Sequence, residues 1–151
     1  MWLMFLLTIV LFIIDIVSKI VVSKLMDVYD SLIIVKDFFY ITYVRNTGVA
    51  WSIFEGEILA IIIVSLMIIT FIIYYIFKNK PKSEFEIIGY SFILGGAFGN
   101  LFDRIIYGYV VDFLDFYIFG YDYPIFNLAD SFIFVGVVLL VICTWRYNDG
   151  D

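Results

Sequence analysis

Four apolar segments dominate the hydropathy pattern of the chain, and polar segments separate them. They cover about residues 2–22, 58–77, 86–104 and 129–146. Each is close to the roughly 20 residues that an α-helix needs to cross a bilayer, and the second has no charged residue. The pattern therefore predicts an all-α polytopic membrane protein with four transmembrane helices.

The two longer polar segments differ in composition. Segment 24–57 contains two runs rich in β-branched and aromatic residues, Ser31–Val35 and Phe38–Val44, which predict a small β-hairpin. A hairpin alone is marginally stable, so we expect it to lean on the membrane surface or on other loops. Segment 105–128 is rich in Tyr and Phe, as is typical of a chain that rests in the headgroup layer.

Glycines mark the segment that follows the predicted hairpin. Segment 45–54 contains Asn46 and Gly48 and is followed by Gly56. One interpretation is a re-entry turn with an aromatic anchor at the interface. The other is a flap that contacts substrate, hinged at Gly48 and Gly56, in which Asn46 hydrogen-bonds a peptide backbone.

The distribution of lysines predicts sidedness. Three lysines crowd the short segment 78–85, and such loops are typically cytoplasmic. Both termini are then cytoplasmic, and segments 24–57 and 105–128 are extracytoplasmic. Because no Lys or Arg precedes the first apolar segment and no small-residue cleavage site follows it, we expect an uncleaved helix.

Composition narrows the class of protein. The chain has 151 residues, of which 64% are hydrophobic, and its mean hydropathy is +1.06; we expect one membrane domain, 1–151. The net charge of −6 argues against a nucleic-acid partner, which requires a basic face. The sequence has no histidine, which excludes a Ser-His triad and a His-ligated metal. Cys143 lies in an apolar run and is expected to be a small buried apolar side chain.

The first apolar segment contains two charged residues, and charged residues inside a membrane are energetically costly, so their presence requires an explanation. Asp15 and Lys19 are four residues apart, on one helix face. They either form a neutralised pair that ties the first helix to its neighbours, or they brace and polarise a site. In both cases we expect the pair to face protein.

Small residues are concentrated in the third apolar segment, where Gly95–Ala97 and Gly99 are typical of close helix packing. Packing does not require the polar residues that follow. Asn100 is expected to cap backbone groups or to orient a carboxylate. Asp103 and Arg104 either mark the outer interface, with Arg104 snorkelling, or Arg104 holds a substrate carbonyl.

Two carboxylates stand where apolar segments end, and we expect both at the outer ends of transmembrane helices. Asp112 lies among apolar neighbours, and Asp130 is near the start of the fourth apolar segment. That segment is short for a bilayer, which predicts that Asp130 is drawn about one turn below the outer surface. Alternatively, Asp130 only caps the helix. Asp115 and Asp122 are also nearby, so acidity alone does not single out Asp112.

A carboxylate pair of this kind suits acid–base chemistry. One carboxylate draws a proton from water and the other protonates a leaving nitrogen, with no metal or other cofactor. Two like charges at close range share one proton near neutral pH. Asn100 and Asn127 are candidates to orient the pair.

Two other classes of function use the same residues. A small proton-coupled transporter or channel component would use the buried acids as a relay. It requires polar residues that extend toward the cytoplasmic side, and the inner halves of the apolar segments offer almost none. A non-catalytic membrane scaffold leaves the outer cluster of Asp and Asn unexplained.

Five sequence blocks, spread over nearly the whole chain, resemble the bacterial lipoprotein signal peptidases (signal peptidase II, or prolipoprotein signal peptidase). The last three blocks together are highly specific. One departure from the family is Trp51, where phenylalanine is usual; we expect it to alter lipid or substrate fit and to leave the chemistry intact. In chain order the blocks are Asp15-x-x-Ser18-Lys19, Asn46-x-Gly48-x-Ala50, Gly95-Gly96-Ala97-x-Gly99-Asn100-x-x-Asp103-Arg104, Val110-Val111-Asp112-Phe113 and Phe126-Asn127-x-Ala129-Asp130.

The resemblance implies an aspartyl endopeptidase of the bacterial cytoplasmic membrane with its site near the outer face. Its substrates are prolipoproteins with a diacylglyceryl group on a cysteine, and it cuts just before that cysteine. An extracytoplasmic sheet and flap are implied, and we expect a monomer that contacts membrane phospholipid, with a groove that admits acyl chains. The catalytic pair carries over to Asp112 and Asp130. The substrate-binding or supporting positions carry over to Asn46, Gly48, Asn100, Arg104, Asn127, Ala129, Asp15 and Lys19.

Overall fold

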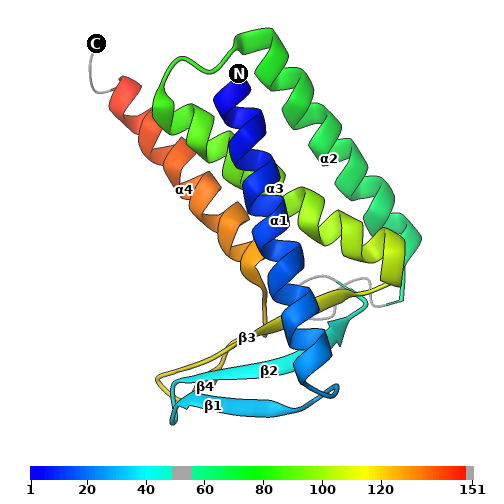
Figure 1. Cartoon of the computed structure of the whole chain (residues 1–151). Helices are drawn as coiled ribbons and strands as arrows, with labels where there is room; N and C mark the ends of the chain where they lie inside the picture. The colour runs from blue at the N-terminus through cyan, green and yellow to red at the C-terminus, as the bar shows by residue number, and fades with distance from the viewer. Residues whose placement is uncertain (49–55, 149–151) are drawn as a thin grey trace.

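The structure is a computed structural model that describes residues 1–48 and 56–148, with the side chains of 146–148 left aside. Four helices in the described part of the chain are long and apolar enough to cross a membrane, as the hydropathy pattern predicts. Most of the predicted flap, with Trp51 in it, lies outside the described residues. The helices are α1 (Trp2–Leu25), α2 (Ile58–Asn79), α3 (Glu84–Tyr107) and α4 (Leu128–Asn148) (Figure 1).

Local signals explain where α3 begins and ends. The Ser83 hydroxyl accepts a hydrogen bond from the backbone N–H of Glu86, which caps the first turn. Gly108 follows the last turn with φ 74°, a left-handed conformation that glycine adopts without strain. Cys143 of α4 lies near the start of α3; its thiol is half-buried, 3.3 Å from the Ser83 hydroxyl, and so is less buried than the sequence predicts.

Helix α3 occupies the centre of the bundle, between α2 on one side and α4 on the other (Figure 1). The small residues of α3 allow close contact with two neighbours, as their spacing predicts. A Cβ at Gly95 would lie 2.7 Å from the Leu11 Cβ of α1, and one at Gly96 would lie 2.2 Å from the Ala129 carbonyl oxygen of α4. A core cluster then joins α2 to α1 and α3; it consists of Met4, Ile69, Ile76, Leu94 and Leu101.

We expect Gly96→Ala to destabilise the bundle by about 1–3 kcal/mol, the usual cost of overpacking. The added methyl group would meet the backbone of α4, which cannot yield without moving the whole helix. Thermal unfolding in detergent measures the effect. Ala60→Leu on the exposed face of α2 is the control and is expected to change stability by less than about 0.5 kcal/mol. Equal melting temperatures for the two variants would contradict the close α3–α4 contact.

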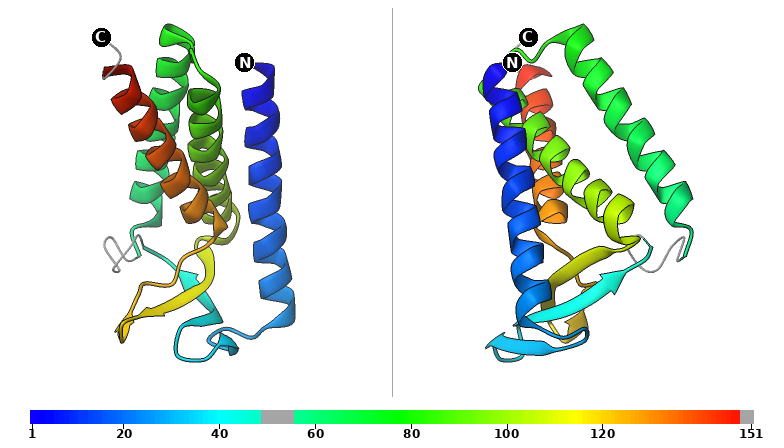
Figure 2. Two further views of the ribbon diagram at one scale, coloured as in Figure 1. Left: turned by 90° about the vertical axis from the view of Figure 1, so that its left-hand side faces the viewer. Right: turned by 45° about the vertical axis from the view of Figure 1, so that its right-hand side comes forward.

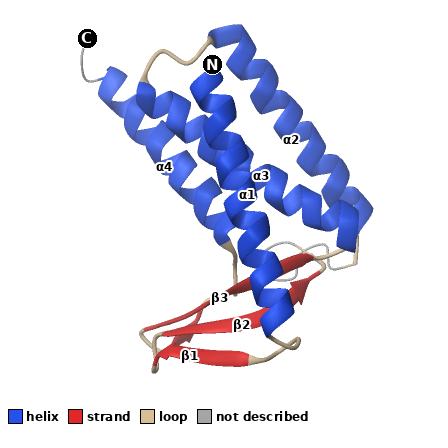
Figure 3. Ribbon diagram, viewed as in Figure 1, coloured by secondary structure: helices blue, strands red, loops and turns tan. Residues whose placement is uncertain are grey.

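A four-stranded antiparallel sheet lies at one end of the bundle, and the start of α1, the end of α4 and the α2–α3 turn lie at the other (Figure 3). The first two strands confirm the predicted hairpin within two residues. The other two strands come from the segment that the sequence suggested would rest in the headgroup layer. The strands, in spatial order, are β1 (Ser31–Val35), β2 (Phe39–Asn46), β3 (Val110–Ile118) and β4 (Tyr121–Asp122).

Strand β3 corrects the expectation that Asp112 lies at the end of a helix. Alternate side chains of this strand face opposite sides of the sheet. Val111 and Phe113 pack in a buried cluster with Val22 and Tyr43, whereas Asp112 faces a cavity beneath the helices. The apolar residues around Asp112 therefore reflect a buried strand rather than a continuing transmembrane helix.

Candidate active site

Two carboxylates from separate elements line one cavity of about 990 Å³. Asp112 comes from β3 and is 3% exposed, and Asp130 comes from the first turn of α4 and is half-buried. They are 18 positions apart in the sequence. The antiparallel pairing of β3 with β2 and the start of α4 bring the two groups to the same place.

Side-chain amides hold both carboxylates. Asp112 accepts hydrogen bonds from the Asn46 amide (2.8 Å) and from the Asn127 amide (2.6 Å). Asp130 accepts one from the Asn100 amide (2.7 Å) and one from the backbone N–H of Asn127 (3.2 Å). Because each carboxylate has two donors and Asn127 serves both, the relative position of the pair is fixed by the fold.

The start of α4 explains the double role of Asn127 and Asp130. The Asn127 side-chain oxygen accepts a hydrogen bond from the Asp130 N–H (3.0 Å), while the Asp130 carboxylate accepts one from the Asn127 N–H. This reciprocal pair is a capping box, which satisfies two otherwise unpaired N–H groups. Asp130 is therefore both a helix-capping residue and a member of the site, and the two interpretations of it are compatible.

A buried ion cluster supports the site from α1. The Lys19 ammonium lies 2.7 Å from Asp15 and 3.2 Å from Asp103, and it donates to the side-chain oxygen of Asn100 (2.9 Å). Since Asn100 in turn donates to Asp130, the cation holds this amide in the orientation that Asp130 needs. The Asp15–Lys19 pair faces protein, as we expected from the cost of charge in a membrane.

Asp15 and Ala129 tie α1 directly to α4. The Asp15 carboxylate accepts a hydrogen bond from the backbone N–H of Ala129 (2.9 Å). Ala129 is fully buried, and a Cβ at Gly99 would lie 2.2 Å from the same carboxylate. The small side chains at 99 and 129 therefore leave the room that a buried carboxylate occupies.

Asp103 is absent from the predicted site residues, and its interpretation as an interface marker is wrong. It is 1% exposed, and its carboxylate accepts a hydrogen bond from the backbone N–H of Val111 (3.1 Å), next to Asp112. It therefore links the Lys19 ammonium to the strand that carries Asp112. Its position three residues after Asn100, on the same face of a helix, was the sequence signal that could have revealed it.

Arg104 is also buried, so the snorkelling interpretation is wrong for it. Its guanidinium donates to the Gly48 carbonyl oxygen (2.9 Å) and lines the same cavity as the carboxylates. Asn46, expected to bind a peptide backbone, donates to Asp112 and accepts a hydrogen bond from the Gly48 N–H (2.9 Å). These contacts connect the start of the predicted flap to the carboxylate pair.

Burial dominates the electrostatics of Asp112, which lies in the sheet outside the transmembrane helices. Burial and, second, the neighbouring charge of Asp130 raise the pKa of Asp112 from 3.8 to about 7. The hydrogen bonds from Asn46 and Asn127 act in the opposite direction because they favour the ionised form. Near neutral pH the Asp112 carboxyl group can therefore both hold and release a proton, as acid–base chemistry requires.

The other part of the cavity is apolar and runs between helices. Within residues 1–48 and 56–148, no three His, Cys, Asp or Glu side chains are placed to share a metal ion. Three helices line this part of the cavity. They contribute Ser65, Ile68, Ile69 and Ile72 from α2, Ile93 and Ala97 from α3, and Ile133, Phe134 and Val137 from α4.

Comparison with known proteins gives one consistent result. The sequence model of the family described as signal peptidase (SPase) II matches residues 7–146. The lipoprotein signal peptidase of Halothermothrix orenii is 38% identical over 97% of the chain and 99% of its own length. That of Staphylococcus aureus is 40% identical over 85% of the chain and 78% of its own length. One solved bacterial membrane enzyme superposes with a TM-score of 0.91 at 35% identity, over 98% of this chain and 90% of its own. A second superposes with a TM-score of 0.85 at 37% identity, over 93% of this chain and 91% of its own.

Proposed function

The chain belongs to the signal peptidase II family, and from this premise we propose that it is an aspartyl endopeptidase that cuts diacylglyceryl-modified prolipoproteins immediately before the lipidated cysteine. Membership makes it a multi-pass bacterial membrane protease of lipoprotein processing. The observation that best supports the aspartyl mechanism is the carboxylate pair, Asp112 and Asp130, which line one cavity and have two hydrogen-bond donors each.

The division of labour follows from the surroundings of each carboxyl group. Asp112 is the more buried of the two, and on that ground we assign it the shared proton in this proposal; burial also raises the pKa of Asp112 to about 7. Asp130 then takes a proton from a water molecule whose oxygen attacks the scissile carbonyl carbon. As the tetrahedral intermediate collapses, Asp112 gives its proton to the departing amide nitrogen. One proton is taken and one is given, and exchange with solvent restores the starting state.

Substrate binding uses both parts of the cavity in this proposal. The peptide around the cleavage point lies between the two carboxylates, where Arg104 and Asn46 offer donors. The acyl chains of the substrate enter from the bilayer into the apolar part, along the Ser65–Ile72 face of α2. The same groove admits membrane phospholipid when no substrate is bound.

The proposal also includes an orientation and an assembly. The three lysines at the α2–α3 turn favour a cytoplasmic position for this end, and hence for both termini. The sheet and the carboxylates then lie near the outer face, where exported prolipoproteins arrive. We propose that one domain, 1–151, works as a monomer, since one chain supplies both carboxylates.

A proton relay across the membrane is less well supported. It needs polar groups that continue from the carboxylates toward the termini. In the described residues, the helical wall of the cavity beyond the site is apolar except for Ser65. For this reason we propose catalysis rather than transport.

The test is cleavage of a synthetic precursor peptide with and without its diacylglyceryl group. We expect the lipidated peptide to be cut, with mass spectrometry placing the new N-terminus at the modified cysteine, and the bare peptide to be left intact. Activity is expected to persist in a strong chelator, because the acid–base pair alone supplies the chemistry. Loss of activity in chelator that added zinc reverses would contradict the mechanism.

Activity is expected to fall as pH rises through about 7. Above that value Asp112 loses the proton that it donates to the leaving nitrogen. The folded pKa also lies above the unfolded value of 3.8, so Asp112 contributes stability that is present at low pH and lost between about pH 4 and 7. Rates measured on both sides of pH 7 test the first statement, and melting temperatures measured between about pH 4 and 7 test the second.

The matched variant for the pH profile is Asn46→Ala. It removes a hydrogen bond that favours the ionised form of Asp112, so the alkaline limb of the profile should move to higher pH. A limb at unchanged pH in this variant would show that another group controls the decline.

A further inference from the structure

Two turns form the end of the sheet that is farthest from the carboxylate pair. The β1–β2 turn and the β3–β4 turn are adjacent, since the Tyr117 N–H donates to the Phe38 carbonyl oxygen (2.9 Å) and the Phe38 and Phe116 rings pack at 5.6 Å. Apolar side chains at this end stay exposed. We call them the sheet tip: Phe38, Ile118, Phe119 and Tyr121.

Phe119 is the extreme member of the sheet tip. Its side chain is 106% exposed, that is, fully open to the surroundings. Its φ is 50° and that of Gly120 is 80°, a left-handed pair in which asparagine or glycine normally occupies the first place. A bulky aromatic residue in this conformation is strained. The sheet therefore holds a phenyl ring outward, at a cost to its own backbone, where the described part of the chain does not cover it.

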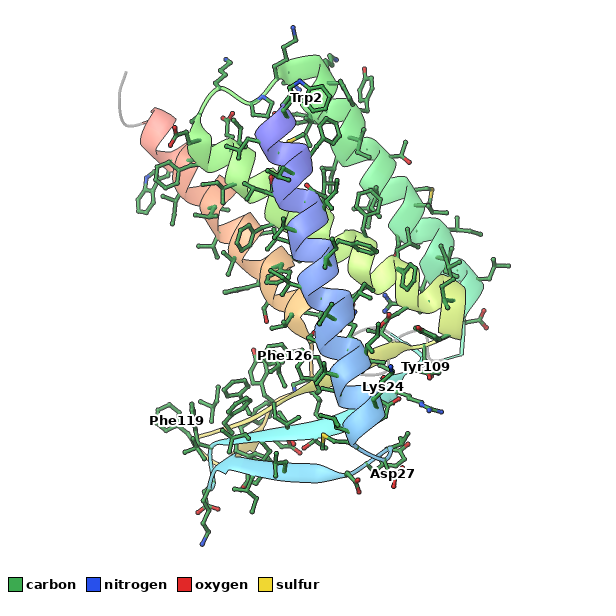
Figure 4. The ribbon with its side chains drawn as sticks, in the orientation of Figure 1. Trp2, Lys24, Asp27, Tyr109, Phe119 and Phe126 are labelled. Carbon is green, nitrogen blue, oxygen red and sulfur yellow. The ribbon has the colours of Figure 1, made fainter. Side chains whose placement is uncertain are left out.

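The position of the sheet indicates what covers the ring. The sheet begins six residues after α1 and ends six residues before α4, so it is continuous with helices that cross the bilayer. It projects sideways from the foot of the bundle (Figure 2), and Phe119 lies at its far end (Figure 4). A sheet that extends sideways at this level runs along the headgroup layer, where aromatic side chains are favoured.

We propose that the sheet tip inserts into the headgroup region of the phospholipid leaflet on the sheet side, as a membrane anchor separate from the four helices. Two strands connect this anchor to the carboxylate site. Strands β2 and β3 are paired along their length: near the tip Phe39 is opposite Phe116, and beside the carboxylates Asn46 is opposite Val110. Lipid contact at the tip therefore steadies the strands that carry Asn46 and Asp112.

Spin labelling tests the insertion directly and does not depend on cleavage. Phe119→Cys is labelled in a Cys143→Ser background and reconstituted into phosphatidylcholine–phosphatidylglycerol vesicles. The control is Asp27→Cys, an exposed position at the α1–β1 turn (Figure 4). We expect the ratio of oxygen to water-soluble nickel-complex accessibility to be several-fold higher at 119 than at 27. Equal ratios at the two positions would overturn the proposal.

A second variant separates anchoring from folding. Phe119→Asn removes the ring and suits the left-handed backbone, so its melting temperature in detergent should equal or exceed that of the parent. Cleavage of a lipidated precursor is expected to fall several-fold in vesicles and to be unchanged in detergent micelles. If the parent cuts nothing, the proposed function fails while the labelling result still stands; if the variant equals an active parent in vesicles, the steadying role of the tip is wrong.

Discussion

Asp112→Asn and Asp130→Asn are each expected to abolish cleavage of a lipidated precursor, with a loss of at least on the order of 10²–10⁴-fold. Asparagine keeps the shape of the side chain and one acceptor oxygen but can neither hold nor accept the transferred proton. Either change therefore removes one half of the acid–base pair. Initial rates with a diacylglyceryl peptide in detergent micelles measure the loss.

The fold is expected to survive both changes. Asp112 is buried among amide donors, so a neutral isostere avoids the cost of burying its charge. At 130, asparagine retains an oxygen that can accept the hydrogen bond from the Asn127 N–H. Both variants should insert into membranes and unfold cooperatively on heating.

Asp115→Asn is the matched control for these variants. Asp115 is also a buried carboxylate on β3, but it contacts the Thr42 hydroxyl (2.5 Å) rather than the cavity. We expect its asparagine variant to keep wild-type rates within a small factor. Turnover close to wild type in Asp112→Asn or Asp130→Asn would remove that residue from the catalytic pair.

Lys19→Met is expected to have the largest effect on stability, a loss of about 3–5 kcal/mol. The ammonium is the shared partner of Asp15 and Asp103, which are 0% and 1% exposed. Without it, two carboxylates remain buried with no compensating cation. Because the Asn100 side-chain oxygen also loses one of its two donors and keeps only the Asn127 amide, the orientation of the amide that serves Asp130 should relax and activity should fall as well.

Chemical unfolding in detergent micelles measures the loss of stability in Lys19→Met, and Lys24→Met is the control variant. Lys24 is exposed in the last turn of α1, so its replacement should change stability by less than about 0.5 kcal/mol. The double variant Asp103→Asn with Lys19→Met removes one of the stranded charges and is expected to recover part of the stability. Identical unfolding of the two lysine variants would contradict the buried cluster.

Some parts of the site were open to inference from the sequence because their signals are local. An acid near the start of the fourth apolar segment, small residues on one face of the third, and a charge pair spaced four residues apart are all readable from short windows. Such patterns pointed to both carboxylates, and the family resemblance implied the eight supporting positions; in the structure these residues are close together or linked through shared partners. Their roles in catalysis remain predictions.

Other parts depended on contacts between distant segments. The buried position of Asp103 is defined by a lysine on α1 and by the backbone of β3. One of the two interpretations of Arg104 placed it at the interface, snorkelling; the contact of its guanidinium with the Gly48 carbonyl, 56 residues away, holds it inside the protein. No short window of sequence contains such partners.

Local hydropathy by itself determined the four transmembrane helices and the first hairpin, since both depend on periodicity and length. Only the tertiary structure showed that the Tyr- and Phe-rich segment 105–128 forms β3 and β4. Strand pairing satisfies backbone groups through another segment, and so β3 needed β2 beside it before it could form. The same pairing carries Asp112 to Asp130. The sequence supplied the acids and the helices, and long-range hydrogen bonding brought the two acids to one cavity.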